Sequence, residues 1–273
     1  MKTPVDAEQE MAINQLAKDP QSEEPASRVG RRSRPLRVAD AIKDWVVERG
    51  LSAGDRLPSE LEMIETFGMA KGTIREAMRI LEAQGLVETK TGPGGGSFVR
   101  QVSHERARAL LGNYFYFKDL TIDDIYQLRE MLEPELAASL AGKLHESALQ
   151  KLERDIAVYS SPPQTLEEER DHHVKSLHFH MHLAKFAENT LLGFLIDFMA
   201  SILTDMTISR HLYDPPNPQL WRKGIEYQSQ LVRALREGNA EQAREIMRSH
   251  MQNARNQMLS QEAAVLHRFI REN

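Results

Sequence analysis

The 273-residue chain contains no cysteine, which excludes disulfide scaffolds, thiolate zinc sites, iron–sulfur clusters and cysteine nucleophiles. Any metal ion must therefore be bound through histidine, aspartate, glutamate or solvent. The chain also lacks an excess of positive charge, because 35 basic residues face 40 acidic ones and the formal net charge is −5. No global basic field therefore points to nucleic acid, although a small DNA-reading module can be part of an acidic chain.

A signal peptide and a long apolar run are missing as well. The most apolar stretch, residues 191–203, is too short to span a bilayer and contains Asp197. We therefore expect a soluble cytoplasmic protein with no membrane partner. At about 150 residues per domain, the length favours two modest domains.

The first 34 residues are rich in Glu, Asp, Gln, Pro and Ser and have no sustained apolar period. Such a composition is typical of a disordered tail. The end of the tail is a basic arm that continues to Arg37, and its arginines are Arg28, Arg31, Arg32 and Arg34. This arm is either a solvated linker or, if a DNA-binding module follows, a contact to DNA phosphates or the minor groove.

The pattern over residues 35–100 predicts one compact unit of three helices and a β-hairpin. Apolar residues recur at helical spacing, a glycine follows each helix, and the third helix covers about 71–84. Two short alternating segments then flank a glycine-rich turn at 92–96. This order is typical of a winged helix-turn-helix, in which the second helix of the motif enters a DNA major groove. An ordinary small α+β domain is the alternative.

The second half of the chain shows helical patterns only. Residues 101–118 are expected to form a linker and the start of this domain, and residues 119–273 an all-α bundle of six or seven helices. The amphipathic stretches are 121–142, 146–158, 165–187, 190–211, 218–237 and 240–270. The expected fold class is therefore mainly α, with an N-terminal winged helix-turn-helix followed by an all-α bundle.

Specific motifs carry a resemblance to a known family. Leu-Pro-Ser-Glu at 57–60, Gly68 and the segment 73–87 resemble the winged-helix signature of GntR-family bacterial transcription regulators. The helical half resembles the FCD effector-binding domain of the FadR subfamily at 129–134, Ala137, Ala138, Phe179, His180, Asn189, 234–243 and His250. The resemblance covers about 38–260. It implies a ligand-responsive transcription regulator rather than an enzyme, acting as a homodimer on a two-fold operator in double-stranded DNA.

The resemblance places most of the DNA contacts on the third helix and on the hairpin. Lys71, Gly72 and Thr73 open this helix, so their side chains and backbone N–H groups point into the groove or at phosphate. Arg75 lies four residues after Lys71 on the same face and could pair with a guanine edge. The remaining expected contacts are Ser59, Arg79, Thr91, Gly94, Gly95 and Gly96.

The chain departs from the family pattern near these contacts. Ala70 and Lys71 stand where members usually carry serine or threonine followed by arginine, and Leu61 replaces a basic residue. Lysine offers a point charge in place of a planar fork, so an operator sequence cannot be borrowed from relatives. Residues 35–100 hold nine basic and ten acidic residues. A single module should therefore bind DNA weakly, and a dimer is expected.

Three polar residues of the helical half lie where the spacing predicts core positions, namely Arg129, His180 and His250. A buried arginine without a partner is costly in free energy. Two explanations stay open: a cavity that holds an anion beside Arg129, or an ion pair with Glu133 or another acid inside the bundle.

The resemblance also implies a divalent metal ion, held by an aspartate and a histidine four residues apart and by two further histidines. The matching positions here are Ser176, His180, Gln228 and His250. Because serine and glutamine are weak ligands for zinc or nickel, no metal cofactor is expected. A divalent metal ion at this degraded site, held by His180 and His250, is the alternative. The four residues, together with Arg129, are instead expected to bind a small carboxylate or phosphate-bearing metabolite.

Five of the ten histidines lie close together, at His172, His173, His178, His180 and His182. The last three alternate by two, which on a helix sends them to different faces, so we expect mainly a solvated face with His178 and His182 on the surface. A His-rich helical metalloenzyme with an accessory winged helix is one alternative function, although HExxH, Ser/His/Asp and phosphate-loop motifs are missing. A DNA-binding protein whose helical half only dimerises is the other.

Overall fold

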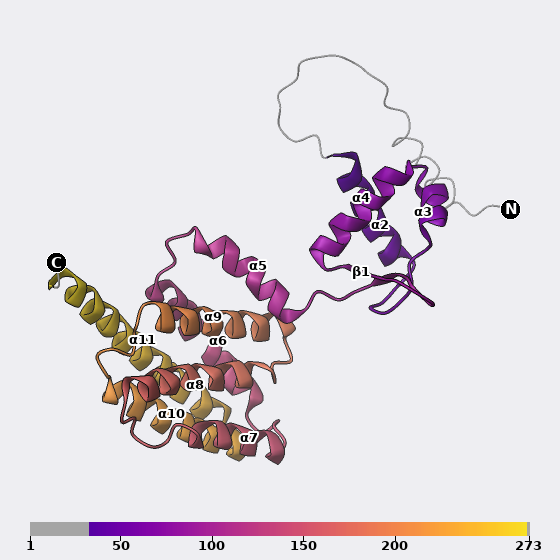
Figure 1. Ribbon diagram of the computed structural model, residues 1–273. Coiled ribbons are helices and arrows are strands. Elements are labelled where there is room, and N and C mark those ends of the chain that lie inside the picture. Colours follow the sequence, from indigo (N-terminus) through magenta and orange to yellow (C-terminus); the bar gives the residue numbers. More distant parts are fainter. Residues whose placement is uncertain (1–32, 272–273) are drawn as a thin grey trace. The chain divides into compact units, whose positions relative to one another are not determined.

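The computed structural model describes residues 33–271, and their side chains as far as Val265. The predicted tail up to residue 32, with Arg28, Arg31 and Arg32 of the basic arm, lies outside the described residues. The chain divides into two compact units between Ala107 and Arg108 (Figure 1). Each unit has a hydrophobic core of its own, so each buries its apolar residues independently.

The first unit contains three helices and one antiparallel two-stranded sheet in its described part, in the predicted winged-helix order. The elements are α2 (Arg34–Glu48), α3 (Glu60–Phe67), α4 (Lys71–Gln84), β1 (Val87–Lys90) and β2 (Gly96–Val99). Ser59 begins α3 through a reciprocal capping box with Glu62. Gly68 and Gly85 end α3 and α4 in the left-handed conformation, with φ of 61° and 78°.

The core of this unit lies between α2, α3, α4 and the loop that precedes α3. Its fully buried side chains include Ile42, Leu57, Met63, Ile74, Ala77 and Leu81. Ile74, Ala77 and Leu81 lie on one face of α4, as their spacing predicts. The opposite face of α4 is consequently left for solvent or for DNA.

The hairpin is fixed by its turn glycines. β1 pairs with β2 so that Lys90 lies opposite Gly96. Arg56 Nη2 donates a hydrogen bond of 2.6 Å to the carbonyl oxygen of Gly95. A Cβ atom on Gly95 would lie 2.5 Å from the carbonyl oxygen of Lys90, so a side chain there would force the turn open.

The second unit is all-helical in its described part, which confirms the predicted fold class. The helices are α5 (His104–Tyr116), α6 (Ile122–Leu140), α7 (Glu146–Ala157), α8 (Leu166–Ala184), α9 (Thr190–Ser209), α10 (Pro218–Glu237) and α11 (Ala240–Arg271). α11 packs along α6 and α10, and α8 lies between α9 and α10 (Figure 1). From α6 onward, each helix agrees with its predicted stretch within a few residues.

The segment 101–118 differs from the expectation. It was expected to be a linker and the start of the helical domain, but most of it is the helix α5, and the boundary between the two units falls inside this helix. No residue of α5 is buried, which explains why core periodicity did not reveal it.

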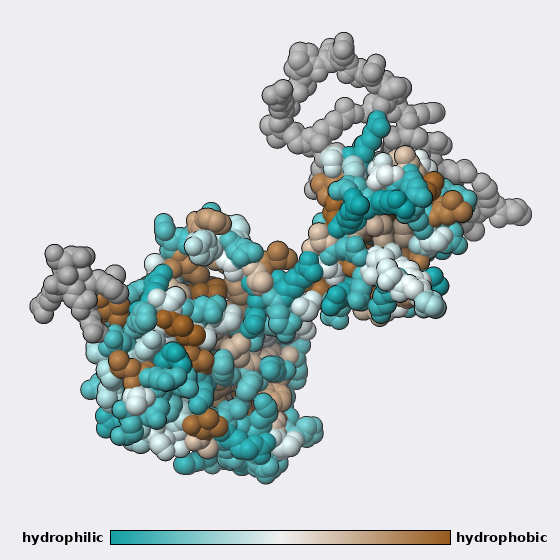
Figure 2. Space-filling view, viewed as in Figure 1, coloured by the Kyte–Doolittle hydropathy of each residue, from teal (hydrophilic) through white to brown (hydrophobic). Residues whose placement is uncertain are grey.

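α9 also differs from the expectation. Over 190–209 it is long and apolar enough to cross a membrane by length and composition, so the shorter stretch assumed from the sequence understates it. About half of the helix is buried inside the unit, and Asp197 on it pairs with Arg108 at 3.1 Å. The visible face of this unit is largely hydrophilic, with apolar residues in small separate groups (Figure 2). These features are typical of the core helix of a helical domain.

Candidate nucleic-acid interface and effector pocket

The solvent face of α4 carries the predicted DNA contacts. Lys71, Gly72, Arg75 and Arg79 are exposed there, and Thr73 is half-buried. The first N–H groups of a helix lack intrahelical partners, and the N-cap residue of α4 is an alanine whose side chain caps none of them. The Thr73 N–H bonds to the carbonyl oxygen of Ala70, so the start of α4 presents the N–H groups of Lys71 and Gly72 and the positive end of the helix dipole, which suits a phosphate group.

One acidic residue that the sequence analysis did not single out organises this face. Glu60 Oε1 lies 3.2 Å from Lys71 Nζ, and Glu60 Oε2 lies 2.7 Å from Arg75 Nε. The hydrogen bond from Arg75 is the main reason that the pKa of the Glu60 carboxyl is lowered. The motif that contains Ser59 places Glu60 in the first turn of α3, so its position could be predicted from the sequence, whereas its two partners could not.

A groove of about 300 Å³ lies between α4 and the hairpin. Arg75 and Arg79 line it from α4, and Thr89 and Ser97 line it from β1 and β2. Arg79 itself pairs with Glu76 at 3.2 Å. The predicted wing residues are split by the structure: Thr91 and Gly94 are exposed at the turn, whereas Gly95 and Gly96 are half-buried against Arg56.

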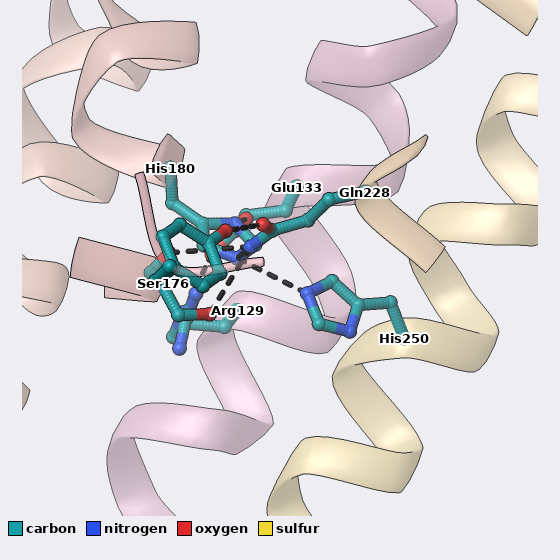
Figure 3. Close-up of polar contacts among 7 residues, drawn as sticks. Arg129, Glu133, Ser176, His180, Gln228 and His250 are labelled. Carbon is teal, nitrogen blue, oxygen red and sulfur yellow. Dashed lines mark hydrogen bonds and ion pairs between the residues drawn. The ribbon is translucent and has the colours of Figure 1, made fainter. Parts of the chain in front are cut away.

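The five residues predicted to bind an effector come together inside the second unit (Figure 3). Arg129 lies on α6, Ser176 and His180 on α8, Gln228 on α10 and His250 on α11. All are buried except Ser176, which is half-buried. The helical spacing therefore identified a polar cluster at the centre of the bundle.

Arg129 forms the ion pair that the sequence left open. Its Nε lies 2.5 Å from Glu133 Oε1, and both side chains are 1% exposed. Burial raises the pKa of Glu133, but Arg129 and His180 outweigh it and lower the value to about 2, so the carboxyl is ionised. One guanidinium nitrogen, Arg129 Nη2, is buried and has no hydrogen-bond partner.

The two buried histidines face each other. His180 Nδ1 lies 2.5 Å from Glu133 Oε2, and because a carboxylate only accepts, Nδ1 carries the hydrogen. His180 Nε2 lies 3.2 Å from His250 Nε2 and can accept in the neutral ring. Burial is the largest influence on both rings and lowers the pKa of His180 and, more strongly, that of His250. Both rings are therefore neutral near pH 7.

Gln228 links α8 and α10 through its side-chain amide. Its Nε2 donates to the carbonyl oxygen and the hydroxyl of Ser176, each at 3.2 Å, and lies 3.4 Å from His180 Nε2. Its Oε1 accepts a hydrogen bond from Tyr159, whose pKa burial raises. Tyr159 follows α7 and was missed in the sequence because its partner lies far along the chain.

A partly enclosed cavity of about 40 Å³ adjoins these residues, enough for a few water-sized groups. Gln228 is the only one of the five predicted residues that does not line it. Thr207 and His250 are among the residues that line it, and Thr207 Oγ1 and His250 Nδ1 are buried without a hydrogen-bond partner. Much of the remaining wall is apolar or aromatic, from Tyr126, Leu177, Leu220, Trp221, Met251, Ala254 and Met258. The cavity thus combines an apolar wall with polar atoms that lack partners.

The histidine run does not form the solvated face that we expected. His173 is buried and its Nε2 lies 3.4 Å from Glu169, and His172 and His173 both line the cavity. His178 is exposed as predicted, whereas His182 is half-buried and bonds to Asp155 at 2.6 Å. The described residues contain no group of three or more His, Asp or Glu side chains arranged to bind a metal ion.

Comparison with known proteins places both units in described families. Residues 35–99 match the bacterial regulatory proteins of the gntR family, and residues 124–253 match the FCD domain. The Uxu operon regulator of Haemophilus influenzae is 27% identical over 228 residues, which cover 80% of this chain and 79% of that protein. The HTH-type transcriptional regulator LutR of Bacillus subtilis is 26% identical over 206 residues, covering 74% of this chain and 91% of that protein.

A solved structure shows the same fold. The GntR protein of Streptococcus agalactiae aligns with a TM-score of 0.60 and 23% identity, covering 81% of this chain and 99% of that one. The matched families and relatives are transcription regulators, so the metalloenzyme alternative is wrong. The chain belongs to the GntR family of ligand-responsive bacterial transcription regulators, with the FCD domain that is typical of the FadR subfamily.

Proposed function

We propose that this chain is a homodimeric regulator that binds a two-fold operator through α4 and changes its DNA affinity when a small carboxylate enters the FCD cavity. The observation that supports this most is Arg129, which lines the cavity and whose Nη2 is buried without a hydrogen-bond partner. An unpaired guanidinium N–H is costly unless a ligand accepts from it, and carboxylate oxygens are suitable acceptors.

The charge of the pocket favours a carboxylate over a phosphate. Glu133 already neutralises Arg129, and the neighbouring histidines are neutral. A monocarboxylate would add one negative charge beside Arg129 Nη2, whereas a phosphate monoester would add nearly two. Because uncompensated buried charge is costly, we favour the carboxylate of the two ligand classes expected from the sequence.

The proposed mechanism is a shift between two dimer geometries. The effector residues come from α6, α8, α10 and α11, so a ligand between these helices can change their packing. We propose that the helical domains dimerise and set the spacing of the two α4 helices. A ligand with different affinity for the two geometries then changes operator occupancy.

The experiment measures operator affinity by fluorescence anisotropy at fixed salt, with and without each member of a panel of short carboxylates and phosphate esters. The operator duplex is obtained by selection from a random-sequence library. Thr207→Val removes a partnerless hydroxyl from a residue that lines the cavity. We expect it to raise the ligand concentration that gives half of the maximal change in operator affinity about tenfold, the effect of one hydrogen bond. Operator affinity without ligand should not change.

Thr204→Val is the matched control on α9, because the Thr204 hydroxyl bonds to the carbonyl of Ala200 and does not line the cavity. If Thr204→Val and Thr207→Val weaken the response equally, the cavity is not the effector site. If no compound in the panel changes the operator affinity, the helical half only dimerises, and the proposal of a ligand-responsive switch at this cavity fails.

A further inference from the structure

The metal site that the family resemblance implies is half suited to a metal ion in this chain. His180 Nε2 and His250 Nε2 are 3.2 Å apart, close to the separation of about 3.3 Å between two nitrogens on one tetrahedral zinc ion. Glu133 holds His180 Nδ1, as a carboxylate behind a ligating histidine does. This half of the site could still accept a cation.

The other half does not fit a metal ion. The carbonyl oxygen of Ser176 can only accept a hydrogen bond, so the Gln228 atom facing it must be the amide nitrogen. The same nitrogen lies 3.4 Å from His180 Nε2, with its N–H groups rather than its oxygen on the histidine side. The lone pair of an amide nitrogen is delocalised into the carbonyl group and does not bind a metal ion, and the partial positive charge on the N–H hydrogens repels a cation.

The amide oxygen is not available to turn toward the histidines either. Gln228 Oε1 accepts the hydrogen bond from Tyr159. Turning the amide around would set Oε1 against the carbonyl oxygen of Ser176, and two acceptors cannot bond to each other. Because Gln228 is 0% exposed, the loss of this hydrogen bond would be costly.

We infer that this pocket holds its effector without a metal ion, and that the Gln228 amide, fixed by Tyr159 and Ser176, bridges α8 and α10 in the place of the cation. The inference rests on the proposed function of the cavity as an effector site. It leaves the partnerless Nη2 of Arg129 as the donor that holds the ligand, since a divalent ion would otherwise do so. The ligand response of this chain is consequently independent of chelators.

The test titrates Co²⁺ into the full chain after dialysis against EDTA and records the visible absorption of tetrahedral Co²⁺. We expect no such band from the wild-type chain. The double variant Ser176→Asp/Gln228→His supplies the two missing ligands, with the aspartate four residues before His180 on the same face of α8. We expect it to bind one equivalent of Co²⁺ at least roughly 100-fold more tightly than the wild type.

Controls separate this site from adventitious binding. In the double variant, His180→Ala should abolish the band, whereas His178→Ala should leave it unchanged because His178 is exposed. If the double variant does not fold, Gln228→His alone removes the amide and offers three histidine ligands with His180 and His250, so we expect it to show the band. Absence of the band in a folded double variant and in Gln228→His would overturn the inference.

The result that most directly contradicts the inference is a wild-type chain that binds one equivalent of Co²⁺ and loses it on His250→Ala. The operator assay separates this failure from failure of the proposed function. If EDTA abolishes the ligand response, the inference is wrong but the proposed regulatory function stands. If no compound in the panel gives a response, with or without EDTA, the proposed function of the cavity is wrong.

Discussion

At the scale of single residues, one carboxylate in each unit determines how the neighbouring cations act. Glu60 holds Lys71 and Arg75 on the exposed face of α4, and Glu133 holds Arg129 inside the bundle. The exposed carboxylate orients its cations at little energetic cost, because water screens both partners. The buried carboxylate is indispensable to its unit, because Arg129 without it would be an uncompensated buried charge.

Glu60→Gln tests the first of these roles. Without the carboxylate, Lys71 and Arg75 can move to phosphates of any sequence, so we expect non-specific affinity to rise. The ratio of operator affinity to non-specific affinity should fall about tenfold. The slope of log affinity against log salt for a random duplex should steepen by about one per chain. Asp44→Asn removes an exposed carboxylate of α2 that does not line the groove, so as the control it should leave the ratio unchanged. Equal effects of both variants would refute a positioning role for Glu60.

The ionisation of Glu133 should make the free energy of unfolding depend on pH in a defined way. Its pKa is lowered from 4.5 to about 2 in the folded chain. A carboxyl with a lowered pKa stabilises the fold above its unfolded pKa, and this contribution, about 3 kcal/mol, is lost as pH falls from 4.5 towards 2. The free-energy difference between the wild type and Glu133→Gln, measured by urea titration, should therefore shrink over this range.

Glu135→Gln on the same helix is the control for this measurement. Glu135 is exposed and pairs with Arg244 at the surface, so its removal should change the free energy of unfolding by less than about 1 kcal/mol. A difference between the wild type and Glu133→Gln that stays constant from pH 4.5 to 2 would show that Glu133 is not ionised in the folded chain.

At the scale of elements, patterns within one helix were sufficient to predict the helices, whereas roles that depend on long-range contacts could not be predicted from the sequence. Caps and apolar spacing predicted α4 and the six helices from α6 onward, because these signals lie within one helix. α5 was missed because none of its residues is buried. The buried position of His173 had a local signal that went unused, since Glu169 lies one helical turn before it. The roles of Tyr159 and Thr207 depend on tertiary contacts and had no local signal.

The start of α4 carries an element-scale prediction. Ser59 caps α3, whereas Ala70 at the same position of α4 offers no side-chain acceptor. Ala70→Ser should therefore raise the free energy of unfolding of the first unit by about 1 kcal/mol. Trp45 lies in this unit, so its fluorescence in a Trp221→Phe background reports the unfolding. Ala70→Gly, which lacks the hydroxyl, should gain less; an equal gain would mean that capping is not the cause.

At the scale of the whole molecule, charge argues for two chains on one operator. The first unit provides nine basic and ten acidic residues over 35–100, and two of its main cations are already paired with Glu60. One copy of such a unit has little electrostatic attraction to DNA, because non-specific affinity grows with the number of phosphates neutralised. Two linked copies gain affinity because the second binds at the high effective concentration that the first creates.

The dimer prediction follows from this argument. Light scattering should give the full chain a mass of twice 31.1 kDa. A fragment of residues 33–107 retains the first hydrophobic core but lacks the helical unit, and it should bind the selected operator at least about 100-fold more weakly. Fusing the fragment to a dimeric coiled coil should recover part of the loss, because the fusion restores the link without the helical unit. The contrary outcome is a full chain with a mass of 31.1 kDa that binds the operator no more tightly than the fragment does. One α4 helix would then be enough for binding, and the two-fold operator would have no physical basis.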